Sequence, residues 1–330
     1  MALYQDINKQ GIQNKYSGYF VPAIILLGIA ISLILVSFGE DKSEFPEFIT
    51  DAFTFTAWVN QGEDYLKEHY RWITRLIASY VKDGYFMFED FLIDSPWVFI
   101  AALLVLPSLA FGGIRLATFM LLGTLYWGMV GLWESAMETL ALMGLSVVLS
   151  VIVGVILGVF CALSDRFERG MKPVLDTMQV MPAFVYLIPV MMLFGITDTS
   201  VLIAVIVYAT IPATRYTIEG LRSVPAGLHD AATMSGVNKF QRLTKIEFPL
   251  AFPHMMLGIN QTIVFALFMV IIGAFIGTED LGQYILKALS DKKGAGIGLT
   301  LGICVAFIAL IFDNLIRAYV QKRKKHLGID

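Results

Sequence analysis

Residues 229–249, HDAATMSGVNKFQRLTKIEFP, form a polar segment between two long apolar stretches of a 330-residue chain. The segment begins with good helix formers and reaches Gly236, which lacks a Cβ and can adopt the left-handed conformation in which helices often end. Residues 239–248 can form a second short helix, and Pro249 limits it while fitting the first turn of a new helix. The segment therefore predicts a helix-turn-helix that lies outside a membrane.

The composition of the whole chain identifies the surroundings of this segment. Hydrophobic residues make up 57% of the sequence and charged residues 15%, and the mean hydropathy is +0.71. A water-soluble domain of this length is less apolar, so the chain is expected to be an integral membrane protein. Cys161 and Cys304 fall in apolar runs without metal-ligand spacing, which indicates small core residues and neither a disulfide nor a metal site. The net charge of −3 excludes a strongly basic nucleic-acid binder.

Membrane spans are expected wherever roughly 17 to 25 residues run without unpaired charge, since the hydrocarbon layer is ~30 Å thick. The sequence predicts an all-α integral membrane protein with about eight transmembrane helices, the first of them a retained anchor. The predicted spans are residues 19–38, 97–111, 116–132, 140–163, 178–194, 201–214, 255–277 and 297–316.

Lysine and arginine in short loops predict which side of the membrane is cytoplasmic. Five basic groups fall on one side of an eight-span chain, and only a group between the last two spans, Lys287, Lys292 and Lys293, opposes them. Both termini and the segment 229–249 are therefore expected in the cytoplasm. The five groups are Lys9 with Lys15, Arg115, the set Arg166, Arg169 and Lys172, the residues from Arg215 to Lys245, and those from Arg317 to Lys325.

The acidic segment 39–95 is expected on the outer side. Within it, apolar residues recur every three or four positions from Leu66 to Val81, a pattern typical of an amphipathic helix. Two interpretations stay open: the helix lies along the outer membrane interface, or it packs on the outer ends of the spans.

The polar segment also matches a known spacing. Asp230-Ala231-Ala232, then Gly236, Ile246 and Phe248-Pro249 resemble the EAA loop of ABC importer permeases, E-A-A-x(3)-G-x(9)-I-x-L-P, with Asp230 replacing Glu and Phe248 replacing Leu. The small residues would let a partner approach one helix face closely. Without the spacing, the segment would be an ordinary cytoplasmic connector. The resemblance implies that an ATPase docks here on His229, Asp230, Ala231, Ala232, Gly236, Val237, Asn238, Phe240 and Gln241.

The resemblance extends over residues 133–320 and is closest to the permeases of the glycine betaine/proline family of osmoprotectant importers. Its most specific string is PAFVYLIP at residues 182–189, and METL at 137–140, MLFG at 192–195, NQT at 260–262 and DLG at 280–282 also match. The resemblance implies an ABC type I importer-like permease core with its EAA loop at 215–250. It further implies a bacterial inner-membrane complex with a second permease copy, two ATPase subunits and a periplasmic substrate-binding protein.

These observations divide the chain into six regions: a cytoplasmic N-terminus at 1–18, an anchor at 19–38, the periplasmic or interfacial segment at 39–95, two spans at 96–132, the permease core at 133–320 and a basic cytoplasmic tail at 321–330. Residues 1–95 share with the family only the general pattern of an apolar anchor followed by an amphipathic segment.

The expected function is a permease subunit that provides the path for a small methylated amine or compatible solute: glycine betaine, proline, choline, carnitine or trimethylamine N-oxide. The sequence has no phosphate-binding G-x(4)-G-K-[ST] loop and no catalytic cluster, so ATP and Mg²⁺ are expected in the partner ATPase and no cofactor or enzymatic activity in this chain. The alternative is an ATP-independent secondary transporter or channel for similar solutes, which would need a coupling-ion site. Carboxylates within the spans, which would favour it, are nearly missing.

Two spans carry the residues expected along the path. Pro182, Tyr186 and Pro189 are spaced to share one helix face, the prolines are expected to bend the span, and an aromatic ring suits a methylated ammonium group. Asn260 and Val264 share a face of another span, while joining helices is the slightly better explanation for Gln261. The alternative for the residues of the first of these two spans is that they face lipid or pack as core aromatics. The expected path residues are Pro182, Phe184, Tyr186, Pro189, Asn260, Gln261, Val264 and Phe268.

Overall fold

A computed structural model describes residues 22–34, 37, 55–278, 280–291 and 294–327, with side chains to residue 322. All regular structure in these residues is helical. Contacts divide the chain into two units, residues 1–69 and 70–330, and the features discussed below lie in the second. After a helix at Pro22–Ile34 come α3 (Phe55–Asp94), α4 (Trp97–Met129), α5 (Trp133–Leu163), α6 (Asp165–Val180), α7 (Phe184–Phe194), α8 (Asp198–Arg222), α9 (Ala226–Met234), α10 (Lys239–Arg242), the π-helix η1 (Leu243–Glu247), α11 (Phe248–Gly273), the 3₁₀-helix η2 (Ala274–Ile276), α12 (Leu281–Ser290) and α13 (Gly294–Leu327).

Most predicted spans correspond to these helices. Among the described residues, five helices are long and apolar enough to cross a membrane, or up to six if the bent pair α6 and α7 forms one span. The first predicted span, 19–38, lies partly outside the described residues, and its described part includes the helix Pro22–Ile34. The five are α4, α5, α8, the continuous run from α10 to η2, and α13.

Helix α4 is broken at Gly113, where φ is 74° and ψ is −170°. A cavity lined by Trp97 at its start and by Leu125 and Met129 near its end shows that the two ends lie together. A straight helix of this length would hold them about 50 Å apart. The chain therefore folds back at Gly113, between the two spans predicted at 97–111 and 116–132.

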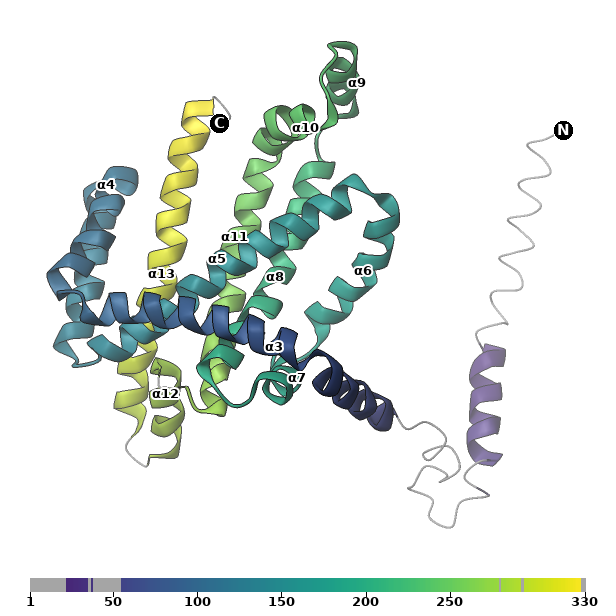
Figure 1. The fold of residues 1–330 in the computed structure, drawn as a ribbon, viewed down its shortest axis with the longest axis horizontal. Helices are drawn as coiled ribbons and strands as arrows, with labels where there is room; N and C mark the ends of the chain where they lie inside the picture. Colours follow the sequence, from purple (N-terminus) through teal and green to yellow (C-terminus); the bar gives the residue numbers. More distant parts are fainter. Residues whose placement is uncertain (1–21, 35–36, 38–54, 279, 292–293, 328–330) are drawn as a thin grey trace. The chain divides into compact units, whose positions relative to one another are not determined.

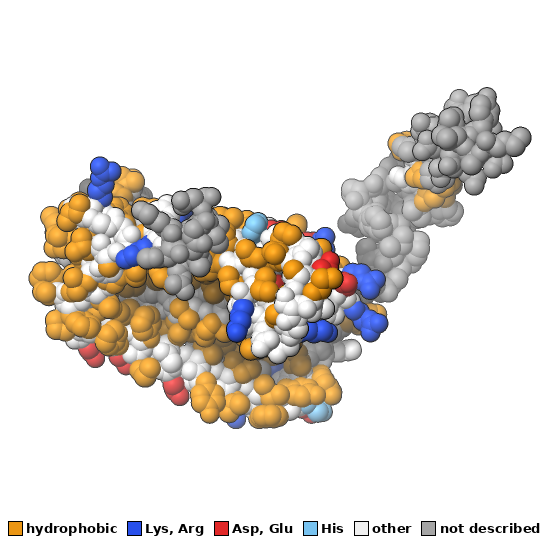
Figure 2. Space-filling view, turned by 90° about the horizontal axis from the view of Figure 1, so that it is seen from above, with side chains coloured by type: hydrophobic (Ala, Val, Ile, Leu, Met, Phe, Trp, Pro, Cys, Tyr) orange, Lys and Arg blue, Asp and Glu red, His pale blue; other side chains and the backbone are white. Residues whose placement is uncertain are grey.

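The centre of the bundle is built from α5, α8 and α11 (Figure 1). Glycines allow these helices to approach closely: a Cβ at Gly154 would meet the side chain of Ala213, and one at Gly158 would lie 2.5 Å from Cβ of Thr217. Small residues at helix crossings stabilise membrane bundles because lipid supplies no hydrophobic drive between helices. Large hydrophobic side chains cover much of the surface (Figure 2), as expected of helices surrounded by lipid.

Helix α3 includes the amphipathic stretch predicted from Leu66 to Val81. In its later part, Tyr85 and Leu92 are buried in the core of the bundle. That later part packs on other helices, whereas Leu66, Tyr70 and Ile77 of the predicted stretch are exposed.

The fifth predicted span, 178–194, is not one straight helix. Helix α6 ends at Val180, α7 begins at Phe184, and the two are bent by 105°. Pro182 lies in the break, where its fixed φ and missing N–H interrupt the helical ladder. The prediction of a bend was right, but the prediction that Pro182 shares a helix face with Tyr186 was wrong.

The two ends of the bundle differ in charge. Figure 1 places α9, α10 and the C-terminal end of α13 at one end and α12 at the other. At the first end, Lys322 Nζ donates to the carbonyl of Ala110 at 3.0 Å, and Arg222 pairs with both Asp165 and Glu168. The basic residues that follow α5, those at the end of α8 and those late in α13 therefore lie with the α9–α10 segment, whereas Lys287 of α12 lies at the opposite end.

Candidate functional site

The segment 226–247 forms the predicted helix-turn-helix. Helix α9 ends in a turn in which the N–H of Val237 donates to the carbonyl of Ala232 at 3.0 Å. Gly236 adopts the left-handed φ of 72°, as its lack of a Cβ predicts. The turn sends the chain directly into α10.

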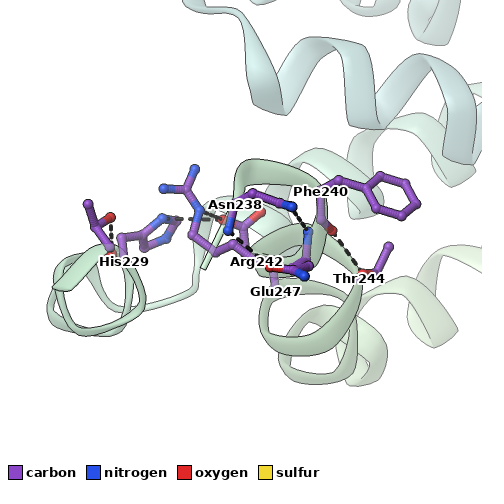
Figure 3. Close-up of polar contacts among 8 residues, drawn as sticks. His229, Asn238, Phe240, Arg242, Thr244 and Glu247 are labelled. Carbon is purple, nitrogen blue, oxygen red and sulfur yellow. Dashed lines mark hydrogen bonds and ion pairs between the residues drawn. The ribbon is translucent and has the colours of Figure 1, made fainter. Parts of the chain in front are cut away.

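Helix α10 begins with a reciprocal cap. The N–H of Gln241 donates to Oδ1 of Asn238 at 2.8 Å, and the N–H of Asn238 donates to Oε1 of Gln241 at 3.2 Å (Figure 3). Such a capping box satisfies two backbone donors that a helix start leaves without partners. Asn238 and Gln241, both predicted to contact an ATPase, therefore also hold the start of α10.

The second helix of the loop does not end at Pro249. Helices α10, η1 and α11 follow one another without a break, and the N–H of Phe248 donates to the carbonyl of Leu243, five residues back. Pro249 falls in the first turn of α11, where its missing N–H and its ring disturb the usual ladder, and a π turn accommodates this. The predicted separate helix at 239–248 is thus corrected: it continues into the membrane bundle.

Glu247 joins the two helices of the loop. Its side chain is buried, and Oε1 lies 2.8 Å from Nε of Arg242 and 3.3 Å from Nδ1 of His229 (Figure 3). Because His229 belongs to α9 and Arg242 to α10, one carboxylate fixes the two helices relative to each other. Sequence reasoning missed Glu247 and Arg242; an acidic residue between Ile246 and Phe248, in a run leading into a span, was the available signal.

The loop exposes apolar side chains. Met234 is 91% exposed and Phe240 is 73% exposed, although both lie at the polar end of the bundle. Asp230 and Ala231 are also exposed, but Ala232 is buried. Ala231 alone of the two alanines can therefore let a partner approach closely. Exposed apolar groups rimmed by polar residues are typical of a protein interface.

The path residues predicted on α7 differ in exposure. Tyr186 is buried and donates its hydroxyl to the carbonyl of Met178, while Pro189 is exposed. The Tyr186 ring lies 5.3 Å from that of Tyr208, which stacks on Phe265 at 4.9 Å. This aromatic cluster joins α7, α8 and α11.

Sequence reasoning missed Tyr208 and Phe265, because each is one aromatic residue in an apolar run. Phe184, also predicted on the path, contacts Phe275 instead, with ring centroids 5.2 Å apart.

The path residues predicted on α11 separate into two groups. Asn260 lines a cavity of about 280 Å³ together with His254, Arg317 and Gln321, and its buried Oδ1 has no hydrogen-bond partner within the described residues. A polar atom in this state usually meets water or a ligand. The other three, Gln261, Val264 and Phe268, are exposed on α11.

Apolar spans, a projecting helix-turn-helix and a continuous helix between them define a multi-span membrane protein whose bundle is linked to an exposed loop. Comparison with known proteins is consistent with this class. The chain belongs to the family of binding-protein-dependent transport system inner membrane components, which matches residues 154–325.

Relatives in this family are similar over more of the chain. The chain is 54% identical over 320 residues to the trimethylamine N-oxide transport system permease protein TmoV of Pelagibacter ubique, covering 96% of this chain and 44% of that protein. TmoV of Ruegeria pomeroyi is 39% identical, with 73% and 37% covered. The glycine betaine/proline betaine transport system permease protein ProW of Escherichia coli is 34% identical, with 79% and 74% covered. The chain thus spans less than half the length of either TmoV protein.

A solved structure of the MetNI methionine ABC transporter in inward-facing conformations is also similar. It aligns with a TM-score of 0.48 at 20% identity and covers 55% of this chain and 92% of its own.

Proposed function

We propose that this chain is the permease subunit of an ATP-driven importer for trimethylamine N-oxide or a closely related methylated amine. Family membership and the 54% identity to a trimethylamine N-oxide permease over nearly the whole chain support the substrate class. The observation that carries the mechanism is the continuous helix from Lys239 to Ile276, which connects the exposed loop to the centre of the bundle.

The proposed coupling starts at the α9–α10 loop. Phe240, Met234 and Ala231 offer an exposed surface to an ATPase subunit. The contact of Glu247 with His229 and Arg242 makes the loop one body, so a displacement of α9 also displaces α10. Because α10 continues into α11, the displacement reaches the α11 face that carries Gln261 and Val264. An ATPase cycle can in this way bias the bundle between outward-open and inward-open states.

The proposed assembly contains a second permease copy, two ATPase subunits, which bind ATP and Mg²⁺, and a periplasmic substrate-binding protein, all at a bacterial inner membrane. The uncovered face of α11, with Gln261, Val264 and Phe268, is available to the second copy or to lipid. The basic residues Arg222 and Lys322 at the loop end support a cytoplasmic loop and a cytoplasmic C-terminus. Hydrolysis belongs to the ATPase, and this chain converts its motion into transport.

The test is to purify the tagged chain from its native membrane, identify the subunits that accompany it, and measure solute uptake in proteoliposomes. An ATPase and a binding protein should copurify, and uptake of labelled trimethylamine N-oxide, glycine betaine or carnitine should require ATP. Uptake that is driven by an ion gradient without ATP would overturn the proposal.

A matched pair of variants tests the docking surface. Phe240→Asp should abolish copurification of the ATPase, because it places a charge in the apolar contact. Leu289→Asp alters an equally exposed apolar residue, 77% exposed, at the opposite end of the bundle, and it should retain the ATPase. Retention by both variants would remove Phe240 from the interface.

A further inference from the structure

A third cavity lies at the end of the bundle opposite the loop. Its volume is about 490 Å³, and it is bounded by α3, by the junction of α7 and α8, and by the end of η2. A volume of this size is typical of sites for small organic molecules. The lining residues that matter for its chemistry are Ser79, Lys82, Phe86, Phe194, Thr197 and Asp198.

The cavity carries one cation and one anion at fixed places. Lys82 Nζ lies 5.6 Å from the centre of the Phe86 ring. Asp198 is the first residue of α8, and Thr197 caps that helix by accepting the N–H of Ser200 at 3.3 Å. The two charged side chains therefore belong to different helices, α3 and α8, and both line the same cavity.

The charge of Asp198 acts on two titratable groups outside the cavity lining. Burial raises the pKa of Asp280 to about 6, and the charge of Asp198 adds to that effect. The pKa of Tyr85 is also raised, first by burial and then by the charges of Glu89, Asp198 and Glu138. Asp198 is thus close enough to several groups to build a negative potential, and a positively charged part of a ligand would be drawn to this side.

The lining complements a methylated zwitterion. A phenyl ring such as that of Phe194 attracts methylated ammonium groups through its π face, and a carboxylate stabilises the same positive charge. An ammonium group such as that of Lys82 donates a charge-assisted hydrogen bond to a carboxylate or an N-oxide oxygen. A purely cationic amine would contact only the carboxylate and the aromatic ring. A fatty or polyanionic molecule would match neither this part of the lining nor Lys82.

We propose that this cavity is an outer binding site for a zwitterionic methylated amine, with Asp198 and the Phe194 ring at its cationic part and Lys82, which lies over Phe86, at its anionic part. The inference rests on the proposed import function and adds a place where the solute is recognised by the permease itself. Lys82 and Phe86 lie outside the family match at residues 154–325, so half of this site comes from a segment that the family match does not cover.

The experiment measures equilibrium binding of labelled trimethylamine N-oxide and glycine betaine to the reconstituted permease–ATPase complex, without ATP and without the binding protein. Lys82→Gln should weaken binding of both about tenfold, as expected for loss of one charge-assisted hydrogen bond. Lys287→Gln is the matched control: Nζ of Lys287 also lies over an aromatic ring, 5.3 Å from that of Tyr284, at the same end but outside the cavity. It should bind both solutes like the unaltered complex.

Choline separates the two halves of the site, because it carries the methylated cation without an anionic group. Its affinity should be unchanged by Lys82→Gln and lowered by Asp198→Asn. Should Asp198→Asn fail to assemble, Phe194→Leu gives the same comparison without altering the start of α8.

Two results would refute the outer site: no saturable binding to the unaltered complex, or equal affinities in Lys82→Gln and Lys287→Gln. If ATP-driven uptake persisted in either case, the proposed function would stand and only the site would fail. If the complete transporter took up no methylated amine with ATP, the proposed function itself would fail.

Discussion

At the scale of single residues, Glu247 has the most consequences. A buried carboxylate is costly unless it is paired and hydrogen-bonded, and here the partners are Arg242 of α10 and His229 of α9. The favourable interactions that offset the cost of burying Glu247 therefore depend on the relative position of the two loop helices. A change at this residue should affect coupling more than folding of the bundle.

Glu247→Gln keeps the shape of the side chain and removes its charge. We expect solute transported per ATP hydrolysed to fall several-fold, and the unfolding free energy to fall by about 1–3 kcal/mol, the usual cost of a lost hydrogen bond to a charged group. Uptake and ATP hydrolysis measured together in proteoliposomes check this. The control is Asp313→Asn, which removes a more exposed pair with Arg317 within α13 and should cost about 0–1 kcal/mol. Unaltered coupling in Glu247→Gln would show that the loop does not act as one body.

Asp280 gives a prediction for pH. Its pKa is about 6 in the folded protein against 3.8 for an ordinary aspartate, so between these values the folded state binds more protons than the unfolded state. The free energy of unfolding therefore falls as pH rises through this range: the contribution of Asp280 is fully present below about pH 4 and lost above about pH 6.

Asp280→Asn abolishes that titration and keeps the cap of α12, because asparagine is an equally good cap. Relative to the unaltered protein, the variant should gain thermal stability between pH 4 and pH 7, by roughly 2–4 °C for each kcal/mol. Thermal unfolding of the purified protein in detergent at several pH values measures the gain. A gain that does not change between pH 4 and pH 7 would contradict the assignment to Asp280.

At the scale of helices, the contact of α5 with α8 depends on glycine. A Cβ at Gly158 would lie 2.5 Å from Cβ of Thr217, so Gly158→Ala must push the helices apart and should destabilise the protein by about 1–3 kcal/mol. Gly302→Ala in α13 meets no atom within 4 Å and should be neutral or slightly stabilising, because alanine favours helix. Thermal unfolding compares the two, and equal stabilities would rule out a tight α5–α8 contact.

The helices themselves could largely be predicted from sequence, because hydropathy and span length are local properties. The left-handed turn at Gly236 and the division of α4 near Gly113 were also predictable, since glycine or basic residues mark them. The bend at Pro182 and the π turn before Pro249 were harder: proline shows where a hydrogen bond is missing, but neighbouring helices decide whether the chain breaks or continues. Burial of Glu247 depends on packing between α9 and α10, which no spacing reveals. The ATPase contacts of the loop remain predictions.

At the scale of the whole molecule, orientation can be tested directly. Cys161 and Cys304 are the two cysteines of the sequence, and both are fully buried. A membrane-impermeant thiol reagent should therefore react only with a single cysteine that is introduced at an exposed position. In intact cells stripped of their outer membrane, Leu289→Cys should react at once, and Phe240→Cys only after the inner membrane is opened. Reaction of Phe240→Cys in sealed cells would place the loop outside and exclude docking of a cytoplasmic ATPase.

The π turn at η1 bears on how the protein tolerates changes in chain length, which substitutions do not reveal. Each residue of an α-helix turns the chain by about 100°, and the π turn holds one residue beyond the α-helical count without rotating the helices on either side. Deleting one residue within Leu243–Glu247 should therefore restore a regular helix and leave α9 and α10 pointing in about the same direction. Deleting one residue from the regular part of α11 would instead rotate α9 and α10 by about that angle around the helix axis. Such a protein would keep its spans and its loop sequence, yet the loop would point in a different direction from the membrane. Changes in length should thus be tolerated within η1 and tolerated poorly in α11.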